Sequence, residues 1–170
     1  MDALSMWNHL LESEVAPQAR ELYERAMDLG QRGEWRAAVA MFEGCIGQLE
    51  RVDAPLAAPA NHSLAVLLQK QGDHDGALFH CVRSIYLYES REDLGGMYAG
   101  LRNLSVVHQS RSESKAALEA QAQAARIRHL LEGRGELTRV QSGRDRYGEP
   151  LVLLSAQEAR ARLVAVRDVG

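Results

Sequence analysis

The sequence predicts an all-α protein, because of its composition and because one turn pattern recurs along the chain. Ala and Leu are abundant and aromatic residues make up only 5% of the 170 residues, a mixture that favours helices over sheets. Gly33, Gly72 and Ser112 each begin a segment typical of a turn between helices, and they lie 39 and 40 residues apart. This period indicates stacked helical hairpins, each too small to bury its apolar face alone. We therefore expect a solenoid of about three hairpins with an extension at each end.

The bulk composition restricts the classes of function. An apolar content of 46% and a charged content of 25% are ordinary for a folded protein. The net charge of −3 argues against a nucleic-acid surface, which normally requires excess positive charge. Arg outnumbers Lys by 18 to 2, which we attribute to a GC-rich, bacterial genome.

The compartment follows from what the sequence lacks. No run approaches 18 apolar residues, and the first residues have neither the basic segment nor the apolar run of a signal peptide. Cys45 and Cys81 fall on predicted apolar helix faces without Cys-x-x-Cys spacing, so we expect free core thiols. The sequence predicts a cytoplasmic protein with no membrane span.

Residues 1–16 form the N-terminal extension and precede the first repeat. Their apolar residues have helical spacing and predict a short amphipathic helix: Leu4, Trp7, Leu10 and Leu11. We expect this helix to cover the first repeat, because terminal repeats need covering. The alternative is a detachable docking helix, since Trp is favoured at binding hot spots.

Three repeats are expected, over residues 17–52, 55–91 and 93–133. Pro17 suits the first turn of a helix, and residues 53–59 are expected to connect the first two repeats. The first repeat has one stripe at Leu22, Arg25, Ala26 and Leu29, and another at Ala38, Phe42, Cys45, Ile46 and Leu49. The later stripes are Leu64, Ala65 and Leu68; Ala77, Cys81, Ile85 and Tyr88; Leu101, Leu104, Ser105 and His108; and Ala117, Ala120, Ala124, Ile127 and Leu131.

Small residues recur at two equivalent places in these repeats, where they would let paired helices approach closely. The first set is Ala26, Ala65 and Ser105, and the second is Ala38, Ala77 and Ala117. The turn between the second pair is Gly72-Asp73-His74, in which Asp73 is expected to cap the following helix.

These residues resemble the tetratricopeptide repeat (TPR) family, in its longer variety of about 40 residues. The family pattern has Leu-Gly or Leu-Ala and then a large apolar residue in the first helix, a Gly-Asp-Tyr-like turn, and Ala, an aromatic and a second Ala in the second helix. It is met here by Leu64-Ala65, Leu68, Gly72-Asp73-His74, Ala77 and Cys81. The first copy meets it with Gly33-Glu34-Trp35, and the third has Leu104-Ser105 and Ala117 but lacks the turn Gly. The resemblance covers residues 17–133. It implies a right-handed solenoid of TPR-like hairpins.

The character of the sequence changes in the C-terminal extension, residues 134–170. Gly and Pro punctuate this segment, and the apolar run 151–154 is compatible with a short β-hairpin near 137–154. Ser155 then begins a capping pattern for a final helix. The extension could cap the third repeat, or it could dock on a second subunit or another protein.

No residue set in the sequence supports catalysis, a cofactor or a metal. His74 lies in a turn where adjacent ligands would converge poorly, and His80 and Cys81 point to different faces of a helix. His108 is expected to be a packed histidine. The sequence has no phosphate-binding Gly loop, nucleophile elbow or zincin helix, so we do not expect an enzyme.

The family resemblance implies a binding groove lined by the first helix of each hairpin. Carried over by position, the groove residues are Arg20, Tyr23, Met27, His62, Val66, Gln69, Lys70, Arg102, Asn103, Val106 and Gln109. Asn103 matches a position where longer-repeat members often bind the ligand backbone, and Arg102 could pair with a carboxylate. The alternative for each residue is a plain solvated helix face. His62 and Val66 do not reproduce the clamp of the chaperone-tail variety, which disfavours that ligand.

The function expected from this resemblance is a non-catalytic adaptor for protein–protein interaction. It would bind a peptide or a helix of a partner in its groove, without nucleic acid or cofactor. The alternative is a structural or regulatory subunit that forms a homo-oligomer, or docks into a larger assembly, through residues 134–170.

Overall fold

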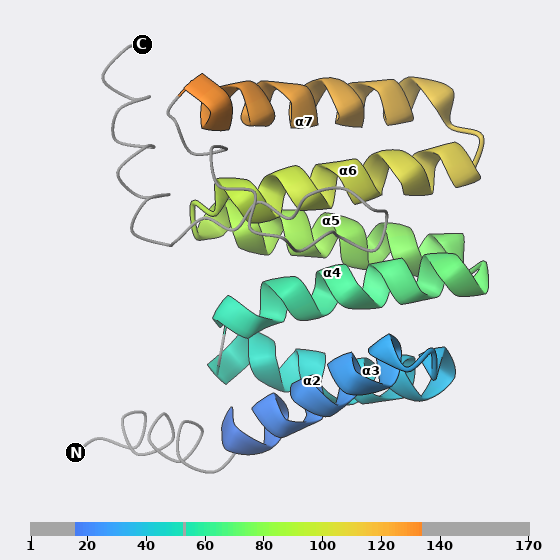
Figure 1. The fold of residues 1–170 in the computed structure, drawn as a ribbon, viewed down its shortest axis with the longest axis vertical. Helices are drawn as coiled ribbons and strands as arrows, with labels where there is room; N and C mark the ends of the chain where they lie inside the picture. Colours follow the sequence, from blue (N-terminus) through green and yellow to red (C-terminus); the bar gives the residue numbers. More distant parts are fainter. Residues whose placement is uncertain (1–15, 53, 134–170) are drawn as a thin grey trace. The chain divides into compact units, whose positions relative to one another are not determined.

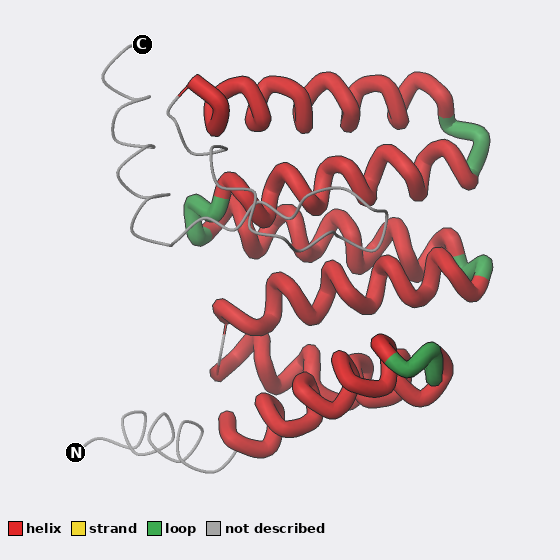
Figure 2. The backbone as a smooth tube through the Cα atoms, in the orientation of Figure 1, coloured by secondary structure: helices red, strands yellow, loops and turns green. Residues whose placement is uncertain are grey.

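The structure is a computed structural model that describes residues 16–52 and 54–133, and this part of the chain is all-α, as predicted. Figure 1 shows its helices, and Figure 2 shows the short turns that connect them. The helices are α2 (Ala16–Gln31), α3 (Trp35–Val52), α4 (Ala54–Gln71), α5 (His74–Ser90), α6 (Leu94–Ser110) and α7 (Ser114–Gly133). Within the described ranges no helix has the length and apolarity needed to cross a bilayer.

The chain divides into two compact units, one through Leu87 and one from Tyr88. In the first unit, α2 packs against α3, and α3 packs against α4. In the second unit, α6 packs against α7. The boundary between the units lies inside α5.

Four interhelical turns share one backbone geometry. Gly33, Gly72, Glu92 and Ser112 have positive φ angles of 82°, 83°, 60° and 62°. At Gly72 the backbone N–H donates to Gln69 O at 3.0 Å, and the next N–H donates to Leu68 O at 3.0 Å. The same pair of bonds recurs at the other three turns. This pattern is the Schellman motif, which satisfies the last carbonyls of a helix. The turns expected at Gly33, Gly72 and Ser112 are therefore present.

Aspartates begin the helices that follow two of these turns. The Asp73 carboxylate accepts a hydrogen bond from the Gly76 N–H at 2.9 Å, and Asp93 accepts one from Gly96 at 2.8 Å. Each carboxylate thus satisfies a backbone donor that has no partner within the helix. The predicted capping role of Asp73 is confirmed.

Both predicted sets of small residues are buried. Ala26, Ala38, Ala65 and Ala77 are fully covered, and Ser105 and Ala117 are each 3% exposed. Phe42, Leu49 and Leu64 fill the first unit, and Leu131 is buried in the second. The prediction that Arg25 belongs to the apolar stripe of α2 is wrong, because this side chain is exposed. Its guanidinium is better solvated in water than against the small side chains of that stripe.

The prediction that residues 53–59 connect two helices is also wrong. Pro17 does lie in the first turn of α2, as predicted, but α4 already begins at Ala54 and contains Pro59. Proline interrupts a helix by removing an N–H and crowding the preceding turn. Here Ala57, Ala58 and Ala60 are fully buried around Pro59. The packing of these alanines stabilises the helix by more than the proline destabilises it. The expectations for residues 1–15 and 134–170, including the β-hairpin and the final helix, lie outside the described residues.

Candidate functional site

The main candidate site is a depression of about 320 Å³ between α6 and α7 in the second unit. It is lined by Tyr98, Arg102, Ser105, Val106 and Gln109 from α6 and by Gln121, Ala124, Ala125 and Arg128 from α7. On both helices these positions follow spacings of three and four residues, which place them on one face. The small side chains of Ala124 and Ala125 leave the space open.

The lining of the depression carries cationic and amide groups. The Arg102 guanidinium lies 5.8 Å from the centre of the Tyr98 ring, a cation–π geometry. Arg128 Nε pairs with Glu132 at 3.4 Å, and both side chains are about half exposed. No acidic side chain lines the depression. Guanidinium groups donate to carboxylates in a planar fork, and glutamine amides both donate and accept, so this surface suits an extended peptide that bears a carboxylate.

Three of the predicted groove residues meet in this depression, namely Arg102, Val106 and Gln109. Asn103 does not line it and is only 2% exposed. On a helix, residues three or four positions apart share a face, whereas adjacent residues do not. The side chains of Arg102 and Asn103 therefore point in different directions. The sequence did not indicate Gln121 or Arg128, since the groove was assigned to the first helix of each pair alone.

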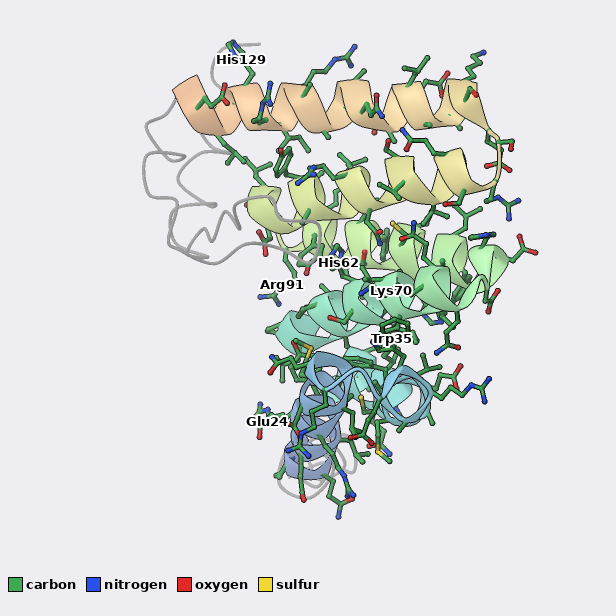
Figure 3. All side chains as sticks on the ribbon, turned by 45° about the vertical axis from the view of Figure 1, so that its right-hand side comes forward. Glu24, Trp35, His62, Lys70, Arg91 and His129 are labelled. Atoms are coloured by element: carbon green, nitrogen blue, oxygen red, sulfur yellow. The ribbon has the colours of Figure 1, made fainter. Side chains whose placement is uncertain are left out.

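The predicted groove residues of the first unit have several environments. Tyr23 packs its ring edge against Phe42 at 5.9 Å, and the Met27 sulfur accepts a hydrogen bond from Ser63 at 3.6 Å. Val66 is 3% exposed, whereas Arg20 and Lys70 are exposed and His62 and Gln69 are half-buried. Lys70 Nζ lies 5.0 Å from the Trp35 ring, and Figure 3 shows the two side chains next to each other. Tyr23, Met27 and Val66 therefore contribute to packing.

A polar network joins three helices of the first unit, and the sequence did not reveal it. Glu50 on α3 accepts bonds from Arg83 Nε at 2.9 Å and Nη2 at 2.8 Å, a bidentate pair with α5. Asn61 on α4 is fully buried and donates to Glu50 at 3.3 Å and to Ala57 O at 3.0 Å. His80 Nδ1 lies 2.8 Å from Asn61 Oδ1, which can only accept, so Nδ1 carries the proton.

The network shifts the titration of its members. The hydrogen bond from Arg83 lowers the pKa of Glu50 below its ordinary value. Burial lowers the pKa of His80, although the carboxylates of Glu43, Glu50 and Asp73 oppose the shift. Both shifts favour an ionised Glu50 and a neutral His80 near neutral pH. The polar groups are satisfied by one another, which points to a structural role.

A second surface lies on α5, where an apolar hollow of about 540 Å³ is lined by Asp75, Leu78, Phe79, Val82, Arg83 and Tyr86. Phe79 is 66% exposed, Val82 51% and Tyr86 57%. The spacing of three and four residues between them was visible in the sequence. The prediction named the other stripe of α5, with Ala77 and Cys81, and did not mention Phe79, Val82 or Tyr86.

The described residues contain no cluster of three or more His, Cys, Asp or Glu side chains that could hold a metal ion. Cys45 and Cys81 are buried thiols in the core that are not joined in a disulfide, as expected. Burial raises the pKa of Cys45 to about 11, which disfavours the reactive thiolate. His108 Nδ1 lies 2.6 Å from Glu113 Oε2, beside the turn at Ser112.

Comparison with models of known protein families, with curated proteins and with solved structures finds no match to this chain.

Proposed function

We propose that the chain is a non-catalytic adaptor of the TPR type, in which the depression between α6 and α7 binds a peptide or a helix of a partner protein. The proposed architecture is a right-handed solenoid of three helical hairpins. Its support is the recurrence of one turn geometry at Gly33, Gly72, Glu92 and Ser112. Buried small residues at equivalent places in each helix pair support it as well.

One observation carries the functional proposal: a hollow lined by two arginines, two glutamines and a tyrosine, with no acidic residue. Ala124 is buried and Ala125 is exposed, and their small side chains leave this space open to solvent. An open, polar lining on rigid helices offers preorganised donors to an incoming chain. Affinity then arises with little ordering of the protein.

The chemistry of the lining specifies the ligand class. Arg102 and Arg128 would bind a carboxylate of the partner, from an acidic side chain. Gln109 and Gln121 would bond with the peptide backbone, since an amide can match both its donors and its acceptors. Val106 and the Tyr98 ring would contact an apolar residue next to the acidic one. The expected ligand is thus a short acidic motif that also contains an apolar residue.

The test has two stages and uses the full chain. An affinity pull-down from the native cell extract first compares the wild type with Arg102→Ala/Gln109→Ala, and with Lys115→Ala as a matched control. Lys115 is a 94% exposed cation on α7 that does not line the depression. Overlapping peptides from any captured protein are then measured by fluorescence anisotropy.

The expected result is a partner that the depression variant loses and the control retains. Removing one charge-assisted hydrogen bond should weaken peptide binding roughly tenfold or more. Capture that is equal in all three proteins would contradict the proposal. It would favour the alternative, a subunit that docks through residues 134–170.

A further inference from the structure

We propose that the exposed apolar face of α5 is a homodimer interface that pairs with α5 of a second copy of this chain in antiparallel orientation. The surface, here called the α5 face, consists of Asp75, Leu78, Phe79, Val82, Arg83 and Tyr86. It is distinct from the depression between α6 and α7. The inference does not depend on the proposed peptide-binding function.

The α5 face faces away from the core of its own unit. The opposite side of α5 is buried through Ala77, Cys81, Ser84 and Leu87. Phe79, Val82 and Tyr86 nevertheless remain more than half exposed. These three large apolar side chains are neighbours on one helix, so they form a contiguous patch rather than scattered single exposures. Such a patch is often functional on a protein surface.

The polar residues of the α5 face make it complementary to itself. Asp75, a carboxylate, stands at its N-terminal end, and Arg83 and the Tyr86 hydroxyl stand at its C-terminal end. A two-fold axis between Phe79 and Val82 reverses the second helix. Each Asp75 then lies opposite the Tyr86 hydroxyl of the other copy, which can donate to it. Such an isologous contact needs only one kind of surface.

The same axis aligns the apolar residues. Phe79 of each copy faces Val82 of the other, at the centre of the contact and away from water. Arg83 is held beside this centre, because Glu50 grips its guanidinium with two bonds and Tyr86 lies 5.4 Å from it. The rim is therefore ordered before association, which reduces the entropy lost on binding.

The size of the α5 face indicates a weak dimer. Its three large side chains expose on the order of 300 Å² in each copy, well below the roughly 800 Å² per partner of standard interfaces. We expect weak association, visible as a dependence on protein concentration. The measurement is sedimentation equilibrium of the full chain over a wide concentration range.

The wild type should change from the monomer mass of 18.8 kDa toward twice that value as its concentration rises. Phe79→Lys and Val82→Glu should each remain monomeric, because two charges would be buried against apolar groups in every dimer. Leu118→Glu is the matched control, since Leu118 is 65% exposed but lies on α7. This control should dimerise like the wild type.

A mixing experiment tests the register directly. In a mixture of Phe79→Lys with Val82→Glu, the introduced lysine faces the introduced glutamate, while the second Phe79–Val82 contact is intact. The mixed pair should therefore associate although neither variant does so alone. In a mixture of Phe79→Lys with Leu118→Glu, no mixed dimer should form, because the introduced lysine would face an unchanged Val82; only Leu118→Glu should pair with itself.

Three outcomes would overturn the proposal. One is a wild type that stays at 18.8 kDa at every concentration. Another is a dimer that persists in both Phe79→Lys and Val82→Glu, which would place the contact elsewhere. The third is the absence of a mixed dimer although both variants keep the helical circular dichroism and melting temperature of the wild type, which would exclude the antiparallel register.

Discussion

The two units of the chain form the same Schellman turn with different residues. In the first unit the positive φ falls on glycine, at Gly33 and Gly72, whereas in the second it falls on Glu92 and Ser112. A left-handed conformation costs a residue with a Cβ roughly 1–2 kcal/mol, and glycine avoids most of this. The turn geometry is therefore set by the helix pairs that it connects, and glycine is the cheapest of several solutions.

The units also differ in how they use polar side chains. In the first unit Glu50, Asn61, His80 and Arg83 tie three helices together. In the second unit His108 and Arg111 both bind Glu113, next to the strained turn at Ser112. Polar side chains thus connect helices in the first unit, whereas in the second unit they stabilise a turn between two helices.

The largest effect is expected at Glu50, where the interhelical bonds of the first unit converge. Glu50→Ala removes the acceptor of Arg83 and one acceptor of Asn61, and should lower the free energy of unfolding by about 2 kcal/mol, an estimate kept low because Arg83 is partly exposed. A double-mutant cycle with Arg83→Ala measures the coupling by urea denaturation. Additive effects of the two substitutions would show that the pair contributes nothing of its own.

Gly72→Ala tests whether glycine is needed at the positive φ angle of the turn. No atom lies within 4 Å of the added Cβ, so the expected loss of about 1–2 kcal/mol is due to the backbone alone. Gly44→Ala on α3 is the matched control, since its Cβ also meets nothing within 4 Å but its backbone is helical. The control should gain up to about 1 kcal/mol. Equal effects of the two substitutions would refute the strain argument.

Ser112→Gly should produce the opposite change in the second unit. Glycine relieves the positive φ, and the chain should gain up to about 1 kcal/mol, reduced by the greater freedom of the unfolded state. Thermal denaturation followed by circular dichroism measures the shift. Destabilisation would mean that the Ser112 side chain makes a contribution larger than the strain.

The smallest effect concerns pH. The pKa of His80 is lowered by burial, so the unfolded chain binds more protons just below pH 6.5, and stability should fall as the pH drops from 6.5 toward the pKa of the folded state. Glu50 and Glu113, whose pKa values are also lowered, add to this loss only below about pH 4.5. His80→Gln should flatten the stability profile just below pH 6.5. An unchanged slope would show that His80 titrates normally.

Much of the fold followed from local signals, and what failed depended on tertiary contacts. The turns at Gly33 and Gly72 were visible because glycine marks a positive φ, and Asp73 was visible as a cap. Pro59 misled the prediction, since nothing local shows that the alanines around it are buried. The spacing of the turns predicted separate helices, and α2 packs against α3 and α6 against α7.

The candidate site was predicted in part. Arg102, Val106 and Gln109 were identified by the position of α6 within the family pattern, and they line the depression. Arg128 was missed because its role depends on how α7 packs against α6. Glu50 and Asn61 are separated by a helix boundary and carry no motif, so only the folded structure brings them together.

The position of the two cysteines allows the opening of the first unit to be measured by alkylation of their thiols. Cys45 and Cys81 are the only cysteines of the chain; both lie before Leu87 and both are fully shielded from solvent. With a pKa of about 11, roughly one Cys45 thiol in a thousand is ionised at pH 8 even before access is considered. Alkylation therefore proceeds through transient opening, and its rate is a clock for the opening of this unit. The rate at which the native thiols react thus reports the rate of local opening in the first unit, without any added probe.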